Sequence, residues 1–412
     1  LAFIVLPFAS YVSLGLLVGL TITAGLQRGR SLRGWLGQWG YGWLSLGLLV
    51  SAAIAPQPGN AFLQAMNFLP YFLMLGSFVV RYRGDPLARR SEQLFALAQG
   101  LIVVSVPFSL LALVEYTVKF PAIAVHVSDW AAFQWAFDVS YNGHHASAML
   151  GYHNILSAYL VIIISLGLGL MTTLYAQRER YFYSFPLVAW ATVGAVVGVF
   201  CSGSRNGLLI TLFLLLLGGI LQKNRWLRLG SVGIAISLVL GVVGLGVGGR
   251  QMSLALMTQD PRVGVWQIAL QMIQQRPLLG WGLGSFGHLY VPGSVQTYDH
   301  IHHAHNLWLY LASETGIPIT LGFCWVAGWP LYRAIKMMLT DTLSRQHRAV
   351  IFSYALAFTS CMLFGLFDVP LFDSRINVLG WLLLGSLYLI TQPPDISEPS
   401  NAVAAANRGT VA

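Results

Sequence analysis

The sequence predicts an all-α polytopic membrane protein, and two observations lead to this fold class. Of the 412 residues, 56% are hydrophobic and only 9% are charged, whereas soluble domains contain about 25% charged residues. Uncharged, mostly apolar stretches such as residues 155–175 and 229–247 suit a bilayer better than a soluble core. This composition excludes a water-soluble globular enzyme.

Windows of about 20 apolar residues predict eleven membrane spans along the chain. They lie near residues 1–26, 35–55, 60–80, 92–118, 152–175, 182–201, 206–222, 227–247, 304–334, 348–367 and 376–391. As one helix the span 304–334 would be about 46 Å long, so we expect a break at Pro318. Because the chain starts in an apolar stretch, we expect a preceding segment and twelve spans in the intact protein. Residues 1–391 are treated as a single transmembrane helical domain.

Basic residues predict the orientation of these spans. Seventeen of the 23 Lys and Arg residues fall in alternate connections and in the tail, which the positive-inside rule places in the cytoplasm. The opposite, periplasmic side then carries two long loops, at about 119–151 and 248–303. Nine of the ten histidines map to that side or to the adjacent span ends. Function is therefore expected there, whereas the tail 392–412 is predicted to be disordered and cytoplasmic.

Arg205 lies in Cys201-Ser-Gly-Ser-Arg-Asn-Gly207, at a periplasmic junction of two spans with almost no loop between them. An arginine at this depth either snorkels to the interface or requires an anionic partner. A guanidinium group binds phosphate oxygens bidentately, and the small residues around Arg205 would let a ligand approach. Arg205 is therefore either a marker of the lipid interface or a phosphate anchor.

Arg262 begins a predicted amphipathic helix in the second long loop. Asp260 is expected to cap this helix, with Pro261 as its first residue, and the helix is expected to end near Gln275. One face is shared by Arg262, Trp266, Ala269 and Ile273, while other positions hold Gln267, Gln271 and Gln274. Such a helix lies along the membrane surface, either as an ordinary interfacial helix or with Arg262 presented to a ligand.

The segment Asp299-His-Ile-His-His-Ala-His-Asn306 concentrates four histidines and a carboxylate in front of an apolar run. These groups could bind zinc, but their spacing is not that of an HExxH site. His305 opens the span and is the best placed general base, because a neutral imidazole can accept a proton near physiological pH. Glu314 is expected to be a buried structural carboxylate, hydrogen-bonded at the helix break.

Gly280-Trp-Gly-Leu-Gly-Ser-Phe-Gly287 only superficially resembles a phosphate-binding loop. No strand precedes it and no GK[ST] follows, so a nucleotide-binding fold is not indicated. We expect a flexible connection that brings the Arg262 helix near His305.

Several motifs between residues 150 and 390 occur together and in a characteristic order. They are Gly151-Tyr-His-Asn154 with Ala158-Tyr-Leu160, Ser204-Arg-Asn-Gly-Leu208, Arg262 with Trp266 through Arg276-Pro-Leu-Leu-Gly-Trp-Gly282, His305-Asn306 with Glu314-Thr-Gly316, and Gly365-Leu-Phe-Asp368. This set resembles the O-antigen ligase and polymerase superfamily of membrane glycosyltransferases. The first 140 residues match only as generic spans.

The resemblance implies a GT-C-like fold with amphipathic helices in a large periplasmic loop, and a role in lipopolysaccharide biosynthesis in the bacterial inner membrane. It implies transfer of a glycan from undecaprenyl diphosphate to a hydroxyl of lipid A core or a similar acceptor. His305 would be the catalytic base, and Arg205 and Arg262 would bind the diphosphate. Supporting roles are expected for His153, Asn154, His303, Asn306 and Glu314. Two cations and one base can serve this chemistry, so no metal or other cofactor is expected. The expected partners are the donor, the acceptor and membrane lipids, but not nucleic acid.

Two alternatives to a ligase remain at this point. A polymerase shares the donor chemistry but uses another carrier-linked repeat unit as acceptor, and its Arg-x10-Gly pattern occurs at Arg89 to Gly100 and at Arg276 to Gly287. Ile319 departs from the small residue that the family often has there, which weakens the assignment to ligase in particular. A transporter of inorganic carbon, a label given to some relatives, would hold ionisable residues near mid-bilayer. Here they gather at the outer face, which favours an enzyme.

Overall fold

A computed structural model describes residues 2–137, 144–177, 184–222, 224–248, 260–295, 298–340 and 343–392 of the chain. These residues form helices and no β-strand, although isolated bridge residues occur, among them the pair Val295 and Tyr298. Among them, eight helical segments are long and apolar enough to cross a membrane. The protein is therefore an all-α polytopic membrane protein, as the sequence predicts.

The helices group into two compact units. Unit 1 comprises Leu1–Ala96, Pro261–Ile351 and Asn377–Ala412, and unit 2 comprises Leu97–Asp260 and Phe352–Ile376. The helices α6 (Leu87–Val104), α19 (Arg345–Phe364) and α20 (Ser374–Thr391) contribute residues to both units. The single transmembrane domain expected for residues 1–391 stays a prediction.

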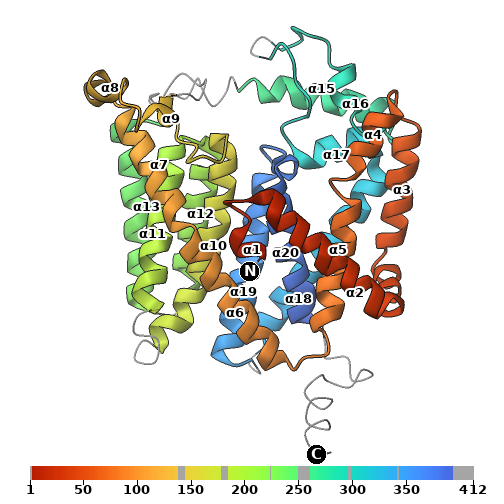
Figure 1. Ribbon diagram of the computed structural model, residues 1–412, viewed down its shortest axis with the longest axis horizontal. Helices are drawn as coiled ribbons and strands as arrows, with labels where there is room; N and C mark the ends of the chain where they lie inside the picture. The colour runs from red at the N-terminus through yellow and green to blue at the C-terminus, as the bar shows by residue number, and fades with distance from the viewer. Residues whose placement is uncertain are drawn as a thin grey trace, which may run out of the picture. The chain divides into compact units, whose positions relative to one another are not determined.

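Among the described residues, unit 1 contains nine further helices. They are α1 (Ala2–Val5), α2 (Ser10–Gln38), α3 (Tyr41–Ala53), α4 (Pro58–Ala65), α5 (Leu69–Tyr82), α15 (Arg262–Gln275), α16 (Ser285–Leu289), α17 (Leu307–Thr315) and α18 (Ile317–Met338). α2 packs against α5, whereas α17 and α18 pack against α3. α15 packs on α17 and runs across one end of the unit 1 helices (Figure 1). A helix lying across a transmembrane bundle is what the sequence predicts for the Arg262 segment.

Close packing of α3 against α18 explains how unit 1 accommodates the unusual Ile319. A Cβ atom added to Gly47 of α3 would lie 2.8 Å from Cδ1 of Ile319, and one added to Gly322 of α18 would lie 2.7 Å from Cδ2 of Leu44. Each helix therefore presents a glycine to a large side chain of the other. The larger residue at position 319 is balanced by the missing side chain at position 47.

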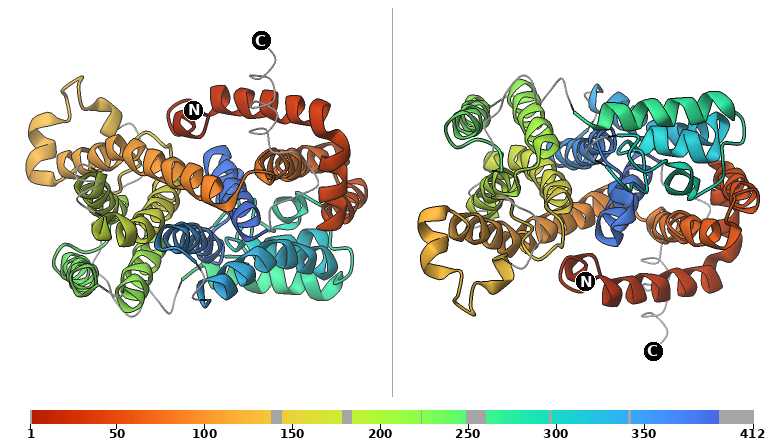
Figure 2. Two further views of the ribbon diagram at one scale, coloured as in Figure 1. Left: turned by 90° about the horizontal axis from the view of Figure 1, so that it is seen from below. Right: turned by 90° about the horizontal axis from the view of Figure 1, so that it is seen from above.

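Unit 2 is a bundle around α10. Its elements are α7 (Val106–Val118), α8 (Pro121–Val127), α9 (Gln134–Phe137), α10 (His153–Ala176), α11 (Ser184–Ser202), α12 (Arg205–Leu221), α13 (Arg225–Leu245) and the 3₁₀ turn η1 (Pro370–Phe372). α11 and α12 both pack against α10, and Figure 2 shows these helices nearly end-on. Of the most apolar window of α10, 83% is buried, against 17% for α13.

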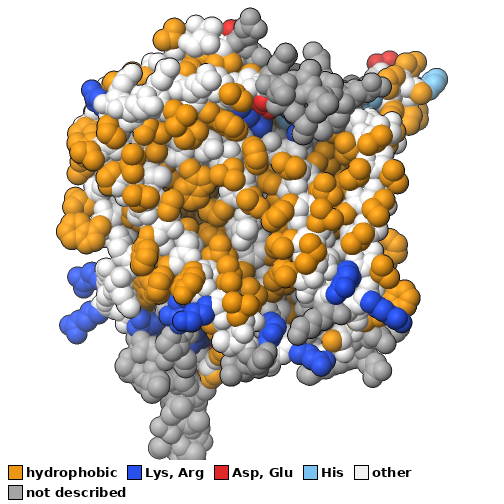
Figure 3. All heavy atoms as spheres, turned by 180° about the vertical axis from the view of Figure 1, so that it is seen from behind, with side chains coloured by type: hydrophobic (Ala, Val, Ile, Leu, Met, Phe, Trp, Pro, Cys, Tyr) orange, Lys and Arg blue, Asp and Glu red, His pale blue; other side chains and the backbone are white. Residues whose placement is uncertain are grey.

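The surface of α13 has the character of a lipid-facing helix. It exposes Ile236, Leu240 and Val243, and the face drawn in Figure 3 is likewise covered mainly by hydrophobic side chains over its helices. Arg225 begins α13, whereas Arg205 begins the preceding helix α12. Since these two helices are antiparallel neighbours joined by a short connection, the two arginines mark opposite ends of unit 2. An apolar belt with basic residues beyond it is expected of an integral membrane protein.

The predicted break in the span 304–334 is confirmed. α17 ends at Thr315 and α18 begins at Ile317, with Pro318 in its first turn, where proline is tolerated. Two other predicted spans are short helices, because α3 has 13 residues and α12 has 17. The count of eleven spans stays a prediction. Residues 249–259 and 296–297 of the second loop, and the tail from residue 393, lie outside the described residues.

Candidate functional site

His305 lies immediately before α17, at the end of unit 1 that also carries α15 and α16. Asn306 caps α17, since its side-chain oxygen accepts hydrogen bonds from the N–H groups of Trp308 and Leu309, both at 3.0 Å. His305 itself has a φ of +47°, a left-handed conformation that is uncommon for residues other than glycine. Such a conformation persists only where the surroundings enforce it, and it often accompanies functional sites.

Three aromatic side chains surround His305. The Trp266 Nε1–H group of α15 donates a hydrogen bond of 3.4 Å to the carbonyl oxygen of His305, and the N–H of His305 donates one of 3.3 Å to Nδ1 of His303. The ring centroids of His303 and Tyr298 lie 4.6 and 5.3 Å from that of His305. We call these four residues the unit 1 histidine cluster. His305 is half-buried, so its ring is held in place but stays accessible.

Arg262 is the first residue of α15, one helical turn before Trp266 of that cluster. As predicted, α15 ends at Gln275 and exposes Gln267, Gln271 and Gln274. Its buried residues are Val265, Ala269 and Met272, so Ala269 is the one fully buried residue of the expected face. Because α15 packs on α17, unit 1 brings the Arg262 helix and His305 together. The sequence predicts this juxtaposition.

The prediction that Asp260 caps α15 is wrong. Pro261 occupies the N-cap position without a side-chain hydrogen bond, and the helix begins one residue later than expected, at Arg262. The Asp260 carboxylate pairs instead with Arg205, with 3.3 Å between Oδ2 and Nη2. Asp260 therefore forms a long-range ion pair and not the expected local cap.

Glu314 is fully buried, as predicted, near the C-terminus of α17. Its carboxylate accepts hydrogen bonds from the N–H groups of Gly284 at 2.8 Å and Phe286 at 3.0 Å. Gly282 N–H donates to the Glu314 carbonyl oxygen at 2.8 Å, and Trp281 N–H to that of Ser313 at 3.0 Å. These bonds fix the glycine-rich segment 280–287 against α17. The segment 280–287 is therefore a fixed loop, and the expectation of a flexible connection is wrong.

Two glycines make this contact sterically possible. Gly280 has a φ of +65° and Gly316 a φ of +83°. A Cβ atom on Gly280 would lie 2.4 Å from the Glu314 carbonyl group, and one on Gly316 would lie 2.2 Å from the carbonyl oxygen of Leu278. The loop and the helix break approach each other backbone to backbone, which a side chain at either position would prevent.

Arg205 begins α12 in unit 2, directly after its N-cap residue Ser204. Its side chain is 43% exposed and pairs with Asp260. The Ser204 hydroxyl donates a hydrogen bond of 2.7 Å to the Asn154 side-chain oxygen, and the Asn154 amide donates one of 2.9 Å to Asp368. The start of α10, the start of α12 and the segment after α19 are thereby joined through three buried side chains. Asn154 thus supports the residue that immediately precedes Arg205.

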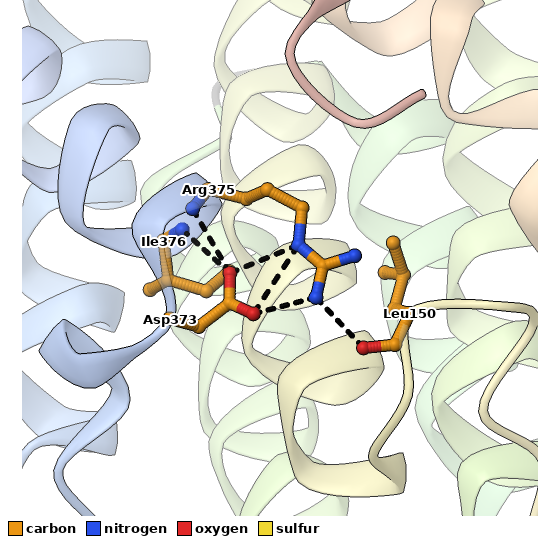
Figure 4. Close-up of polar contacts among 4 residues, drawn as sticks. All are labelled: Leu150, Asp373, Arg375 and Ile376. Carbon is orange, nitrogen blue, oxygen red and sulfur yellow. Dashed lines mark hydrogen bonds and ion pairs between the residues drawn. The ribbon is translucent and has the colours of Figure 1, made fainter. Parts of the chain in front are cut away.

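Sequence reasoning assigned no role to two ion pairs of unit 2. Glu115 is buried and pairs with Lys119 at 2.7 Å. Arg375 pairs with Asp373 and donates a further hydrogen bond of 2.7 Å to the carbonyl oxygen of Leu150 (Figure 4). The sequence does offer a signal for the first pair, because Glu115 and Lys119 are four residues apart at a span end. The partners of Glu115, Lys119 and Arg375 in the loop before α10 cannot be read from the sequence.

The segment that carries the candidate site residues can be compared with known proteins. Residues 190–324 match the family model described as O-Antigen ligase. The resemblance to the O-antigen ligase and polymerase superfamily is therefore confirmed. No curated protein matches the chain.

The match to the O-antigen ligase family includes Arg205, Arg262, His305 and Glu314. Members of this family are enzymes of the glycosyltransferase type, and their substrates are glycan-lipids in the membrane. The apolar helices of both units agree with such a location.

Proposed function

We propose that this protein is an O-antigen ligase-like glycosyltransferase. It moves a glycan from an undecaprenyl diphosphate carrier to a hydroxyl group of lipid A core, or of a similar acceptor, at the periplasmic face of the inner membrane. The observation that carries this proposal is the O-antigen ligase match over residues 190–324. The matched segment contains both candidate phosphate-binding arginines and the candidate base.

In the proposed reaction the acceptor oxygen forms a bond to the anomeric carbon of the donor glycan. The bond from that carbon to the diphosphate breaks, and its electron pair leaves with the diphosphate. His305 takes the proton of the acceptor hydroxyl, a task for which a neutral imidazole is suited. Support comes from the contacts that fix the backbone of His305 at φ +47°, its hydrogen bonds with Trp266 and His303, and from the rings of His303 and Tyr298, which pack against the imidazole.

Arg262 and Arg205 each contribute to binding of the diphosphate in this proposal. Arg262 is half-buried and lies one turn from Trp266 of the unit 1 histidine cluster. Arg205 is partly exposed and already pairs with a carboxylate, Asp260. A phosphate oxygen can replace that carboxylate, because a guanidinium fork fits both anions. Since a diphosphate is a good leaving group and two guanidinium groups stabilise its charge, the proposed reaction uses no metal.

Glycan analysis of a deletion strain tests the proposal and separates it from the alternatives. For a ligase, lipid A core loses its long chains while the finished polymer accumulates on the undecaprenyl carrier. Accumulation of single repeat units would assign the protein as a polymerase. Unchanged glycans would exclude both enzymes and favour the transporter. Complementation with the wild-type gene, but not with His305→Ala, links the phenotype to the proposed base.

A further inference from the structure

Unit 1 contains a pocket whose wall is the segment Arg276-Pro-Leu-Leu-Gly280, a motif to which the proposed function gives no role. The pocket has a volume of about 360 Å³ and is lined by this segment and by Ile54, the residue that follows α3. We call it the Arg276 pocket. Its volume is within the range of small-ligand pockets, roughly 300–1,000 Å³. Because the lining residues other than Arg276 are apolar, the pocket fits a hydrocarbon group.

Hydrogen bonds keep the walls of the Arg276 pocket in place. The Ile317 N–H group, at the start of α18, donates one of 2.8 Å to the carbonyl oxygen of Pro277. The Ser51 hydroxyl of α3 donates one of 3.2 Å to the carbonyl oxygen of Glu314. The end of α3, the segment 276–280 and the break between α17 and α18 are therefore tied together, and these bonds fix the shape of the pocket.

The Arg276 pocket lies at one end of a candidate membrane span. Ile54 comes four residues before Pro58, where the apolar span Pro58–Tyr82 begins. Leu278 and Leu279 of the pocket wall are 70% and 55% exposed, although both are large apolar side chains. Exposed apolar side chains that lie next to each other mark a surface that contacts a membrane or a partner. At the end of a membrane span, the hydrocarbon they contact is that of lipid.

Arg276 adds a positive charge to this apolar surface. Its guanidinium carbon lies 3.9 Å from the centroid of the Trp281 ring, and the Trp281 Nε1–H group donates a hydrogen bond of 3.0 Å to the carbonyl oxygen of Met272. The indole is thus held in place, and it holds the guanidinium group by a cation–π contact. Such a contact uses none of the N–H donors of arginine, which stay able to bind an anion.

The charge of Arg276 is not balanced by the described helices around it. α3, α15 and α16 contain no acidic residue. Glu314 of α17 is buried, and its carboxylate accepts the N–H groups of Gly284 and Phe286. Among the described residues, Arg276 takes part in no ion pair. A cation beside an apolar pocket at a membrane surface complements a phosphorylated lipid, whose phosphate binds the guanidinium group and whose chain enters the pocket.

The Arg276 pocket and His305 lie at opposite ends of α15 and α17. Trp266, which contacts His305, comes ten residues before Arg276, and Asn306 comes ten residues before Gly316 at the other end of α17. At 1.5 Å per residue, each helix places the pocket about 15 Å from the candidate base. A lipid with its phosphate at Arg276 can therefore react at His305 only through a group that lies about this far from its phosphate.

This distance distinguishes the two lipid substrates of the proposed reaction. The diphosphate of the donor is bonded directly to the carbon that reacts, so a donor phosphate at Arg276 would keep that carbon away from His305. The acceptor carries sugars between its lipid and its reacting hydroxyl. We propose that the Arg276 pocket docks the lipid end of the acceptor, an acylated and phosphorylated glycolipid. Naming the lipid as the acceptor rests on the proposed function.

Binding of lipid A to the purified full-length protein in detergent, measured by native mass spectrometry, tests this site. Arg276→Gln should bind lipid A about tenfold more weakly, the effect of losing one hydrogen bond to a charged group. Leu279→Gln should bind it about fourfold more weakly, the effect of one methylene less in apolar contact. Arg225→Gln is the matched control and should bind like the wild type, because Arg225 is also exposed and lies over a tryptophan ring, that of Trp226, but in unit 2.

Two other lipids distinguish the acceptor from other sources of a lipid phosphate. Phosphatidylglycerol represents the bulk membrane lipids, and undecaprenyl phosphate represents the carrier of the donor. We expect the wild type to bind lipid A more tightly than either, a comparison that needs no variant. Equal binding of phosphatidylglycerol, or tighter binding of undecaprenyl phosphate that Arg276→Gln weakens, would overturn the assignment to the acceptor. Wild-type affinity for lipid A in both pocket variants, or an equal loss in Arg225→Gln, would overturn the site itself.

Transfer kinetics separate failure of this site from failure of the proposed function. With a lipid-linked acceptor, Arg276→Gln should raise the KM for the acceptor about tenfold and leave kcat and the KM for the donor unchanged. With lipid-free core oligosaccharide as acceptor, the variant and the wild type should behave alike. Transfer with an unchanged acceptor KM would refute the site alone. Arg276-dependent binding of lipid A by a protein that transfers no glycan would refute the proposed function alone.

Discussion

Among the described residues, each unit of the protein buries one glutamate that holds a loop by accepting hydrogen bonds from two backbone N–H groups. In unit 2, Glu115 holds Ser147 and Ala148 of the loop before α10. In unit 1, Glu314 holds Gly284 and Phe286 of the segment between α15 and α17. The same device thus fixes the loop that carries His145 in one unit and the loop that joins the Arg262 helix to the His305 helix in the other.

The two glutamates differ in how their charge is compensated. Glu115 has a cationic partner, Lys119, which is itself only 9% exposed. Glu314 is compensated by N–H groups of the glycine-rich segment and by the side chain of Tyr310, and the ion pairs found among the described residues do not include it. The two loops also differ in how closely their backbones approach the neighbouring helix. Gly280 and Gly316 permit the glycine-rich segment to approach the end of α17 backbone to backbone, whereas the loop that Glu115 holds is bonded through Ser147 and Ala148, which have side chains.

The largest loss of stability is expected for Glu115→Ala, because it strands Lys119 as a buried charge. Removing one partner of a buried ion pair typically costs about 3–5 kcal/mol. The double variant Glu115→Ala, Lys119→Met should recover part of the loss, which a double-mutant cycle of unfolding in detergent measures. Glu92→Ala, at an exposed position of α6, is the control. An equal loss in the single and double variants would show that the ion pair is not what holds the loop.

A smaller loss is expected for Glu314→Gln, because no cation is stranded. The amide retains one acceptor but turns its NH₂ group toward one of the two N–H donors, and a buried donor left unsatisfied costs about 1–3 kcal/mol. The same unfolding assay should rank Glu314→Gln between Glu92→Ala and Glu115→Ala. If it is as harmful as Glu115→Ala, the contrast between the two kinds of compensation is incorrect.

The two units can also be compared by their effect on glycosyl transfer, because each contains one candidate diphosphate-binding arginine. Arg205→Lys and Arg262→Lys keep the charge but lose the bidentate fork. Each should lower glycosyl transfer by roughly tenfold, the loss of one hydrogen bond to a charged group, with membrane insertion and melting unchanged. Transfer by purified protein from a polyprenyl diphosphate-linked donor gives the rates. Normal transfer in both variants would contradict a specific phosphate clamp.

Features that depend on neighbouring residues could be predicted from the sequence. The end of α15 before Pro277, the helix break expected at Pro318 and the burial of Glu314 all follow from local patterns, and the structure confirms them, with the break itself at Gly316. Features that depend on distant partners could not. Asp260 forms a typical local capping pattern, yet it pairs with Arg205, 55 residues away.

The position of His145 could not be predicted from the sequence for the same reason. Its anchors come from α7, from the junction of α11 and α12 and from Gly248. The sequence separates these segments by up to about a hundred residues, and no spacing rule connects them. The role of the glycine-rich segment 280–287 could likewise not be predicted from the sequence, because the N–H group of Gly284 binds the carboxylate of Glu314, 30 residues further along the chain.

The measurement that tests the central claim most directly is glycosyl transfer by His305→Ala, with His302→Ala as its control. His302 is an exposed neighbour in the same loop. If His305 is the base and no metal takes part, His305→Ala lowers the rate by about 10²–10⁴, His302→Ala has a mild effect, and EDTA leaves the wild type active. Transfer that survives in His305→Ala, or that EDTA abolishes and zinc restores, would contradict the account.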